Sequence, residues 1–279
     1  MNTHRPRIVV GYDGSPDADA AASWAGQMAR LRGEPVVVTI AVDPMESPRR
    51  PNWPESWWEE IERQARETLA GVGATDVTIE RHLAAIVTTL VAASSDASML
   101  VLGSRGHGRI GEALLGSVSQ NAARQAQCPL VVVRRAHDAD AHRIVVGVDD
   151  SKPSLRALEF ACRQAAATRD AVVLYRAWKP LTMPIDTHGD VSASMSRTLL
   201  EEEEALQKSV VEARTRYPEI EIEGEFIAER AGQALVSASN TASMVAVGSR
   251  GHGALAEAAL GSVSHHVLQH SRCPVAVVR

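Results

Sequence analysis

The chain has 279 residues, of which 45% are hydrophobic and only 4% are aromatic. At about 150 residues per domain, this length predicts two domains, each large enough to bury a core without disulfide bonds or metal ions. The formal net charge of −5 argues against a general nucleic-acid-binding protein, which usually carries a basic surface.

The chain alternates short runs of Val and Ile with longer helical patterns. Apolar strands of this kind are typical of a sheet that helices cover on both faces. The first half is expected to contain strands near 7–12, 35–42, 76–82, 98–102 and 129–134, and helices near 16–32, 55–70, 84–95 and 117–127. The second half is expected to contain strands near 143–149, 171–178, 220–227, 243–247 and 274–279, and helices near 152–168, 193–216, 231–240 and 262–272.

This alternation predicts an α/β fold with two tandem open parallel sheets of five strands, each with helices on both faces. The crossovers between parallel strands should be right-handed. Ligands bind such sheets outside the carboxyl ends of the strands, where the strand order reverses. Candidate binding residues are therefore expected in the loops that follow the strands.

The second half of the chain repeats the first. Segments 97–119 and 242–264 share 16 of 23 residues, where composition alone would give about one or two identities. We therefore predict two duplicated domains, 1–135 and 143–279, joined by a short polar linker. The last strand of each half is apolar and would form a sheet edge, and exposed edges invite pairing. We expect the halves to pair there as an internal pseudo-dimer, and a homodimer of whole chains is left open.

Glycines follow the fourth predicted strand of each half. Gly103 and Gly106 lie in the sequence GSRGHG, and Gly116 and Ser117 then open a helix after nine further residues. Glycines let the backbone approach a ligand closely, and several backbone N–H groups can surround one anion. The positive end of the helix dipole also favours a phosphate. The side chains of Arg105, Ser117 and Ser119 are expected to add hydrogen-bond donors.

The second half carries the same glycine spacing, so this pattern occurs twice. One such pair of glycines is a weak indication, because ordinary turns also contain it. Two copies, each between an apolar strand and a helix that starts with serine, favour phosphate binding. The pattern is not a Walker A loop, because no Gly-Lys-Ser/Thr follows. It is not the dinucleotide fingerprint either, because it follows the fourth strand and not the first.

With these motifs, nearly all of both halves resembles the universal stress protein family in its tandem form. The repeated glycine motif is that of the family's ATP-binding branch. The resemblance implies that each half holds the triphosphate and ribose of ATP, with Mg²⁺ accompanying the triphosphate, and ADP and AMP are the alternative ligands. In the first half the implied residues are Gly103, Ser104, Arg105, Gly106, His107, Gly108, Arg109, Gly116, Ser117, Val118 and Ser119. In the second half they are Gly248, Ser249, Arg250, Gly251, His252, Gly253, Ala254, Gly261, Ser262, Val263 and Ser264.

The ends of the first two strands of each half are implied to meet the nucleoside. By resemblance, the carboxylates there lie against it, and the backbone after the second strand meets the adenine edge. The implied residues are Gly11, Asp13, Ala41 and Val42 in the first half and Gly147, Asp149, Ala177 and Trp178 in the second. Each aspartate has the alternative role of a turn or helix-capping residue, and Trp178 that of a packed loop residue rather than a base-stacking one. Asp150, which replaces Gly14, is expected to add negative charge beside the second pocket.

The sequence leaves three hypotheses for the function of this protein. The leading hypothesis is a regulatory protein that binds ATP during stress, because no catalytic residues can be placed from spacing. The second hypothesis is a slow Mg²⁺-dependent ATPase or phosphotransferase, which would use Asp13 or His107 to orient water. The alternative interpretation of His107 and His252 is that they are solvated loop residues without a role in binding. A scaffold without nucleotide would use the tryptophan-rich segment 43–58, which is either a lid or partner surface or a loop folded on its own sheet.

Three cysteines without close spacing predict neither a disulfide framework nor a metal site. No segment has the length and apolarity of a membrane span, and the apolar run near the N-terminus is too short for a signal peptide. We therefore expect a cytoplasmic protein that does not bind membranes.

Overall fold

The computed structural model describes residues 5–45, 54–106, 115–134, 141–178, 193–251 and 260–279. Strands and helices follow one another along these residues in the predicted order. The first half contains β1 (Arg7–Gly11), α1 (Pro16–Arg32), β2 (Val36–Val42), α2 (Glu55–Gly71), β3 (Val77–Leu83), α3 (Ile86–Ala93), β4 (Ala97–Gly103), α4 (Ser117–Gln125) and β5 (Leu130–Val133). The second half contains β6 (Arg143–Gly147), α5 (Lys152–Thr168), β7 (Ala171–Ala177), α6 (Ala193–Arg216), β8 (Ile222–Ile227), α7 (Ala231–Ala238), β9 (Met244–Gly248), α8 (Ser262–His270) and β10 (Val275–Val278).

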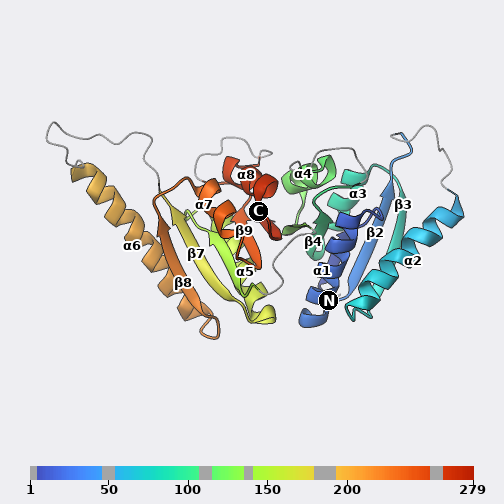
Figure 1. Ribbon diagram of the computed structural model, residues 1–279, viewed down its shortest axis with the longest axis horizontal. Coiled ribbons are helices and arrows are strands. Elements are labelled where there is room, and N and C mark those ends of the chain that lie inside the picture. Colours follow the sequence, from blue (N-terminus) through green and yellow to red (C-terminus); the bar gives the residue numbers. More distant parts are fainter. Residues whose placement is uncertain (1–4, 46–53, 107–114, 135–140, 179–192, 252–259) are drawn as a thin grey trace.

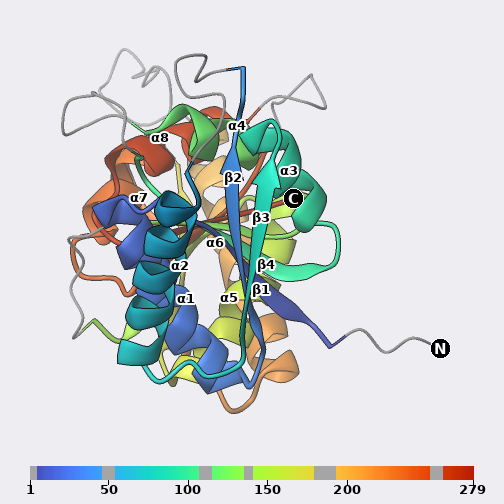
Figure 2. The same ribbon diagram turned by 90° about the vertical axis from the view of Figure 1, so that its right-hand side faces the viewer.

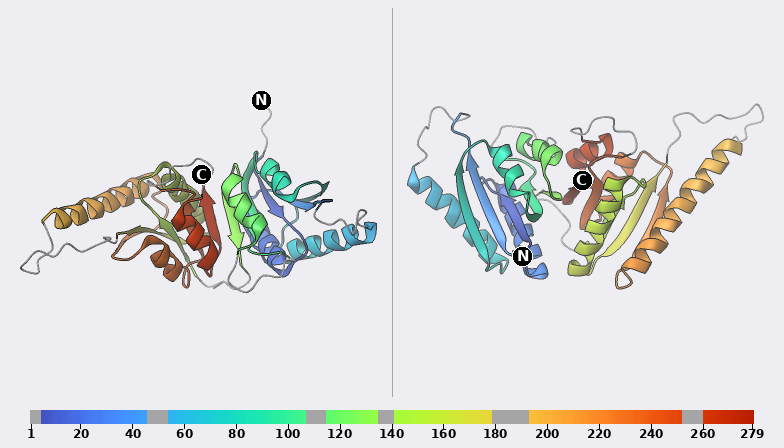
Figure 3. Two further views of the ribbon diagram at one scale, coloured as in Figure 1. Left: turned by 90° about the horizontal axis from the view of Figure 1, so that it is seen from above. Right: turned by 180° about the vertical axis from the view of Figure 1, so that it is seen from behind.

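The strands of both halves form one ten-stranded sheet, in the order β3-β2-β1-β4-β5-β10-β9-β6-β7-β8. The pairs within each half are parallel, which confirms the predicted fold class. The last strands of the two halves, β5 and β10, pair as expected, in antiparallel orientation, and join the two predicted sheets into one, with Val131 opposite Ala276. The view from above in Figure 3 shows these two strands side by side at the centre of the molecule.

Helices cover both faces of the sheet, as Figures 1 and 2 show. Side chains alternate between two buried clusters along each strand: Ile8 and Val10 belong to one cluster and Val9 to the other. The first cluster packs under α1, α2, α5 and α6, and the second packs under α3, α4, α7 and α8. The inner strands are buried on both sides, so they lack the polar alternation of a half-exposed sheet, whereas β3 and β8 at the margins are only partly buried.

The long helices of the first face begin where the sequence contains capping residues. The Ser15 side chain accepts a hydrogen bond from the backbone N–H of Ala18, and Pro16 occupies the first helical position of α1. The buried face of α1 consists largely of alanines, including Ala21 and Ala25, which are fully buried. These small side chains let α1 lie close to β4, and this approach brings the start of α1 next to the loop that follows β4.

The two halves also meet through their helices beside the central strands. Gln120 of α4 and His265 of α8 approach each other, with 3.1 Å between Nε2 and Nε2. The guanidinium of Arg134 donates hydrogen bonds to the Gln269 carbonyl, at 3.0 Å, and to the Leu268 carbonyl. Since α4 and α8 each follow a glycine loop, the starts of these two helices lie on the same side of the molecule (Figure 1).

The tryptophan-rich segment 43–58 is described at residues 43–45 and from residue 54 onward. Trp58 of α2 is buried in the core, and the Trp57 ring contacts it edge-to-face at 5.0 Å between ring centroids. This part of the segment therefore folds on its own sheet, which is the second of the two expected roles, and Trp53 lies outside the described residues. In the described chain, every helix is too short or too polar to cross a membrane.

Candidate functional site

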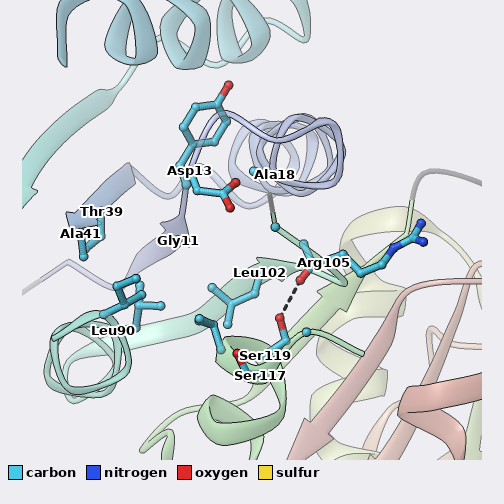
Figure 4. A pocket seen from close by; sticks show the side chains of 16 residues that line it. Gly11, Asp13, Ala18, Thr39, Ala41, Leu90, Leu102, Arg105, Ser117 and Ser119 are labelled. Atoms are coloured by element: carbon cyan, nitrogen blue, oxygen red, sulfur yellow. Dashed lines mark hydrogen bonds between the residues drawn. The ribbon is translucent and has the colours of Figure 1, made fainter. Parts of the chain in front are cut away.

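A cavity of about 370 Å³ opens at the carboxyl ends of β1 and β4 in the first half (Figure 4). Backbone from Gly103, Gly106 and Gly116 lines one end of it. Thr39, Ala41 and Leu90 lie together at the other end. The lining residues are Gly11, Tyr12, Asp13, Ala18, Thr39, Ala41, Ile86, Leu90, Leu102, Gly103, Arg105, Gly106, Gly116, Ser117, Val118 and Ser119.

The loop after β4 is tied to the start of α4. The Ser119 hydroxyl donates a hydrogen bond of 2.7 Å to the Gly103 carbonyl, drawn as a dashed line in Figure 4. The Gly116 N–H donates to the Ser104 carbonyl at 2.8 Å. Ser119 was expected to donate its hydroxyl proton to a ligand, but that proton already forms the hydrogen bond to the Gly103 carbonyl. Ser117 is exposed at the start of the helix and lines the cavity, as expected of a ligand-binding hydroxyl.

The amino end of α4 lacks the capping that α1 has. Gly116 occupies the N-cap position, and no side chain of the described chain caps the helix there. The first turn, Ser117-Val118-Ser119, also contains no acidic residue. The first N–H groups of a helix have no partners within the helix, and they carry the positive end of its dipole. This end of the cavity therefore favours an anion.

Asp13 has the turn role that the sequence offered as one of two alternatives, and it also lies at the cavity wall. Its Oδ1 accepts a hydrogen bond of 2.9 Å from the Ser15 backbone N–H, which is the geometry of an aspartate turn. Its Oδ2 lies against Gly106, where any Cβ would collide with it. The side chain still lines the cavity, so the turn fixes the carboxylate at the cavity wall (Figure 4).

Ser104 and Arg105 connect the loop to α1. The buried Ser104 hydroxyl donates to Asp17 Oδ2 at 2.6 Å, and Arg105 Nε lies 3.3 Å from the same oxygen. In Figure 4 the Arg105 guanidinium points away from the end of the cavity that contains Thr39 and Leu90. Arg105 was expected to add a hydrogen-bond donor for phosphate; in the structure its Nε lies against Asp17, and the residue still lines the cavity.

The other predicted residues of the first half divide into two groups. Val42 is absent from the lining: its side chain is buried on the opposite face of the sheet, and its carbonyl accepts from the Ala84 N–H at 3.0 Å. His107, Gly108 and Arg109 lie outside the described residues.

The second half repeats this arrangement. Asp149 Oδ1 accepts from the Ser151 N–H at 3.1 Å, and Ser264 donates its hydroxyl to the Gly248 carbonyl at 2.6 Å. Gly261 occupies the N-cap position of α8 and donates its N–H to the Ser249 carbonyl at 2.8 Å. The backbone around the amino end of α8 therefore has the same arrangement as the backbone around the amino end of α4.

The remaining predicted residues of the second half lie around these groups. Ala177 ends β7, and the half-buried Trp178 donates its N–H to the Ile227 carbonyl at 2.9 Å. The others lie on the predicted elements: Gly147 ends β6, Arg250 and Gly251 follow β9, and Ser262 and Val263 begin α8. His252, Gly253 and Ala254 lie outside the described residues.

Asp150 differs from its expected role. It adopts the left-handed conformation that Gly14 has in the first half, with φ of 61° against 77°. Its carboxylate pairs with Arg176 at 2.8 Å, and Arg176 Nε also contacts Glu202 of α6 at 2.6 Å. Arg176 lies between Tyr175 and Ala177 on β7, so its side chain belongs to the α6 face of the sheet. The charge of Asp150 is therefore balanced on that face and is not added to a pocket.

The structure adds apolar residues that the sequence reasoning did not assign to the site. Ile86 and Leu90 recur at i, i+4 in α3, and Leu102 precedes the glycine loop. Their periodicity predicts burial against the sheet, and all three line the cavity. Thr39 was also missed, although it is the single polar residue in the apolar run of β2.

Comparison with known proteins agrees with the duplicated architecture. The sequence model of the universal stress protein family matches residues 4–134 and again residues 141–279. The chain belongs to the universal stress protein family. It carries two family domains in tandem, as the sequence predicts.

Relatives within the universal stress protein family cover nearly the whole chain. A universal stress protein of Mycobacterium bovis is 34% identical over 293 aligned residues, which are 98% of this chain and 96% of the relative. One of Mycobacterium tuberculosis is 33% identical over 291 residues, with coverage of 98% and 96%. The crystal structure of a universal stress protein from Archaeoglobus fulgidus has a TM-score of 0.68 at 19% identity and 99% coverage of both chains, and this likeness supports the fold.

Proposed function

We propose that this member of the universal stress protein family binds ATP, or ADP or AMP in its place, at the carboxyl ends of the strands in each half. It would act as a cytoplasmic nucleotide sensor in the response to stress. Buried free thiols at Cys128, Cys162 and Cys273 agree with a reducing compartment. Mg²⁺ would arrive with the triphosphate, because this ion is usually held by phosphates, water and one or two carboxylates.

The observation that carries this proposal is the division of the first cavity into two chemically different ends. Glycine backbone and the uncapped start of α4 suit a phosphate chain, since backbone N–H groups and the helix dipole both stabilise negative charge. Ala41, Ile86 and Leu90 suit the faces of a planar ring. The volume of about 370 Å³ falls in the range of small-molecule sites, roughly 300–1,000 Å³.

The first test is isothermal titration calorimetry of the whole chain with ATP, ADP and AMP. Saturable binding of up to two nucleotides per chain is expected. The variant Gly106→Ala should lose the first-half site, because the added Cβ collides with the Asp13 carboxylate. Gly71→Ala is the matched control, because a Cβ at Gly71 meets no atom within 4 Å. The proposal is refuted if the wild-type chain gives no binding heat and no thermal shift at millimolar nucleotide.

A second measurement separates a sensor from an enzyme. Single-turnover incubation with excess protein and labelled ATP reports phosphate release directly. A sensor should retain intact ATP over many times the lifetime of the complex. Release of phosphate on the timescale of binding would replace the sensor with the ATPase alternative.

A further inference from the structure

Thr39 brings a buried hydroxyl without a partner to the wall of the first cavity. Its side chain is 1% exposed, and its Oγ1 has no hydrogen-bond partner among the residues that the structure describes. Thr39 also lines the cavity. Buried polar groups in native proteins are nearly always paired, so an unpaired hydroxyl at a cavity wall indicates a partner that arrives from the cavity.

The position of Thr39 in β2 makes the hydroxyl unnecessary for packing. The strand reads Val-Val-Val-Thr-Ile-Ala-Val and is buried along nearly its whole length. Valine has the same shape as threonine and would leave no polar atom unpaired at this site. An unpaired buried hydroxyl lowers the stability of the free protein. The threonine therefore fits a role in binding better than a role in folding.

Thr39 lies at the end of the cavity away from the anion-binding backbone. Its neighbours there are Ala41 and Leu90, and these side chains carry no hydrogen-bonding group (Figure 4). The phosphates of a nucleotide would occupy the glycine end, so the ring would lie against Thr39. A hydroxyl both donates and accepts, and it can therefore pair with either a ring nitrogen or an exocyclic amino group.

The second half has a different residue at the matching position. Tyr175 occupies in β7 the place that Thr39 occupies in β2, with Glu225 as its cross-strand neighbour where Thr39 has Glu80. Burial and a hydrogen bond to Glu225 raise the pKa of the Tyr175 hydroxyl. Its ring packs against the buried cluster on this face of the sheet. The Tyr175 hydroxyl thus has a protein partner, whereas the Thr39 hydroxyl has none among the described residues.

We propose that Thr39 is a specificity-determining residue of the first half, whose hydroxyl pairs with the polar edge of the nucleobase, and that the second half lacks this contact. This inference rests on the proposed nucleotide binding. The two halves would then differ in affinity and in selectivity among bases, although the loops after β4 and β9 share the sequence GSRGHG and the same glycine spacing. Two binding steps of unequal strength are the expected behaviour of the whole chain.

The test compares Thr39→Val with the matched variant Tyr175→Phe, each in the whole chain and titrated with ATP by calorimetry. Thr39→Val should weaken one binding step by about 5–30-fold, the effect of losing one buried hydrogen bond, and leave the other step unchanged. Tyr175→Phe should leave both steps unchanged. Without nucleotide, Thr39→Val should melt at the wild-type temperature or a few degrees above it, because it removes the unpaired hydroxyl.

The outcomes separate the two proposals. Failure of the wild-type chain to bind ATP overturns the proposed function and this inference with it. Wild-type affinity in Thr39→Val overturns the inference alone. A loss of affinity in Thr39→Val together with a lower melting temperature of the free protein also overturns it, because that pattern shows a packing role. Equal losses in both variants would contradict the difference between the halves.

Discussion

Gly103 offers a direct test of how the glycine loop is built. A Cβ at this position would lie 2.7 Å from the carbonyl carbon and oxygen of Asp17 and 2.9 Å from the nitrogen of Ala18. Ordinary contacts of a Cβ begin near 3.4 Å, so Gly103→Ala must push the first turn of α1 away from β4. Because these neighbours are helical backbone, no side-chain rotation can relieve the collision. Overpacking of this kind costs about 1–3 kcal/mol of unfolding free energy.

The assay for Gly103→Ala is urea denaturation followed by circular dichroism. The midpoint should fall while the slope stays constant, because the same surface is exposed on unfolding. The matching variant Gly248→Ala should behave alike, since its Cβ would lie 2.7 Å from the Ser154 nitrogen. Gly71→Ala, where no atom lies within 4 Å, should be neutral or stabilising by up to about 1 kcal/mol. Wild-type stability of Gly103→Ala would refute the idea that the loop requires this close approach.

Two further predictions concern buried groups. Ser119→Ala should cost about 1–2 kcal/mol in the same urea assay, because the Gly103 carbonyl loses its donor, whereas Ser117→Ala should change stability by less than about 0.5 kcal/mol; equal effects would contradict the assigned hydrogen bond. Burial raises the pKa of the Cys128, Cys162 and Cys273 thiols to about 12, so a thiol reagent at pH 8 should label them quickly only in denaturant. Because these thiols ionise near pH 8.5 in the unfolded chain, their contribution to stability is complete below that pH and is lost progressively as the pH rises toward the folded pKa of about 12. A urea midpoint that does not fall between pH 8 and pH 10 would contradict this.

Much of the fold could be predicted because its determinants are local in sequence. The sequence predicts α1 at 16–32 and α5 at 152–168, and the structure has the same bounds, because Ser15 and Ser151 cap these helices just before a proline. Strand ends moved by a residue or two, although glycines end β1, β4, β6 and β9 and prolines directly precede β2, β5 and β10. The repeat also located the glycine loops correctly, because the same spacing occurs in both halves.

The roles of individual side chains were harder to predict. The contacts of Ser104 and Arg105 with Asp17 were not predicted, because Asp17 is more than 80 residues away and no local sequence pattern indicates it. Asp150 depends in the same way on Arg176 and Glu202, which come from β7 and α6. Side-chain partners of this kind are set by tertiary packing, so a motif predicts where a loop lies better than it predicts what each of its side chains binds.

The order of the sheet also determines how copies of this chain can associate. Because β5 and β10 use each other as neighbours, the strands left at the two margins are β3 and β8. Both carry charges at their centres, with Glu80 and Arg81 in β3 and Glu223 and Glu225 in β8. Charged margins resist the addition of another strand. Growth of the sheet into a filament by addition of strands at β3 or β8 is therefore disfavoured.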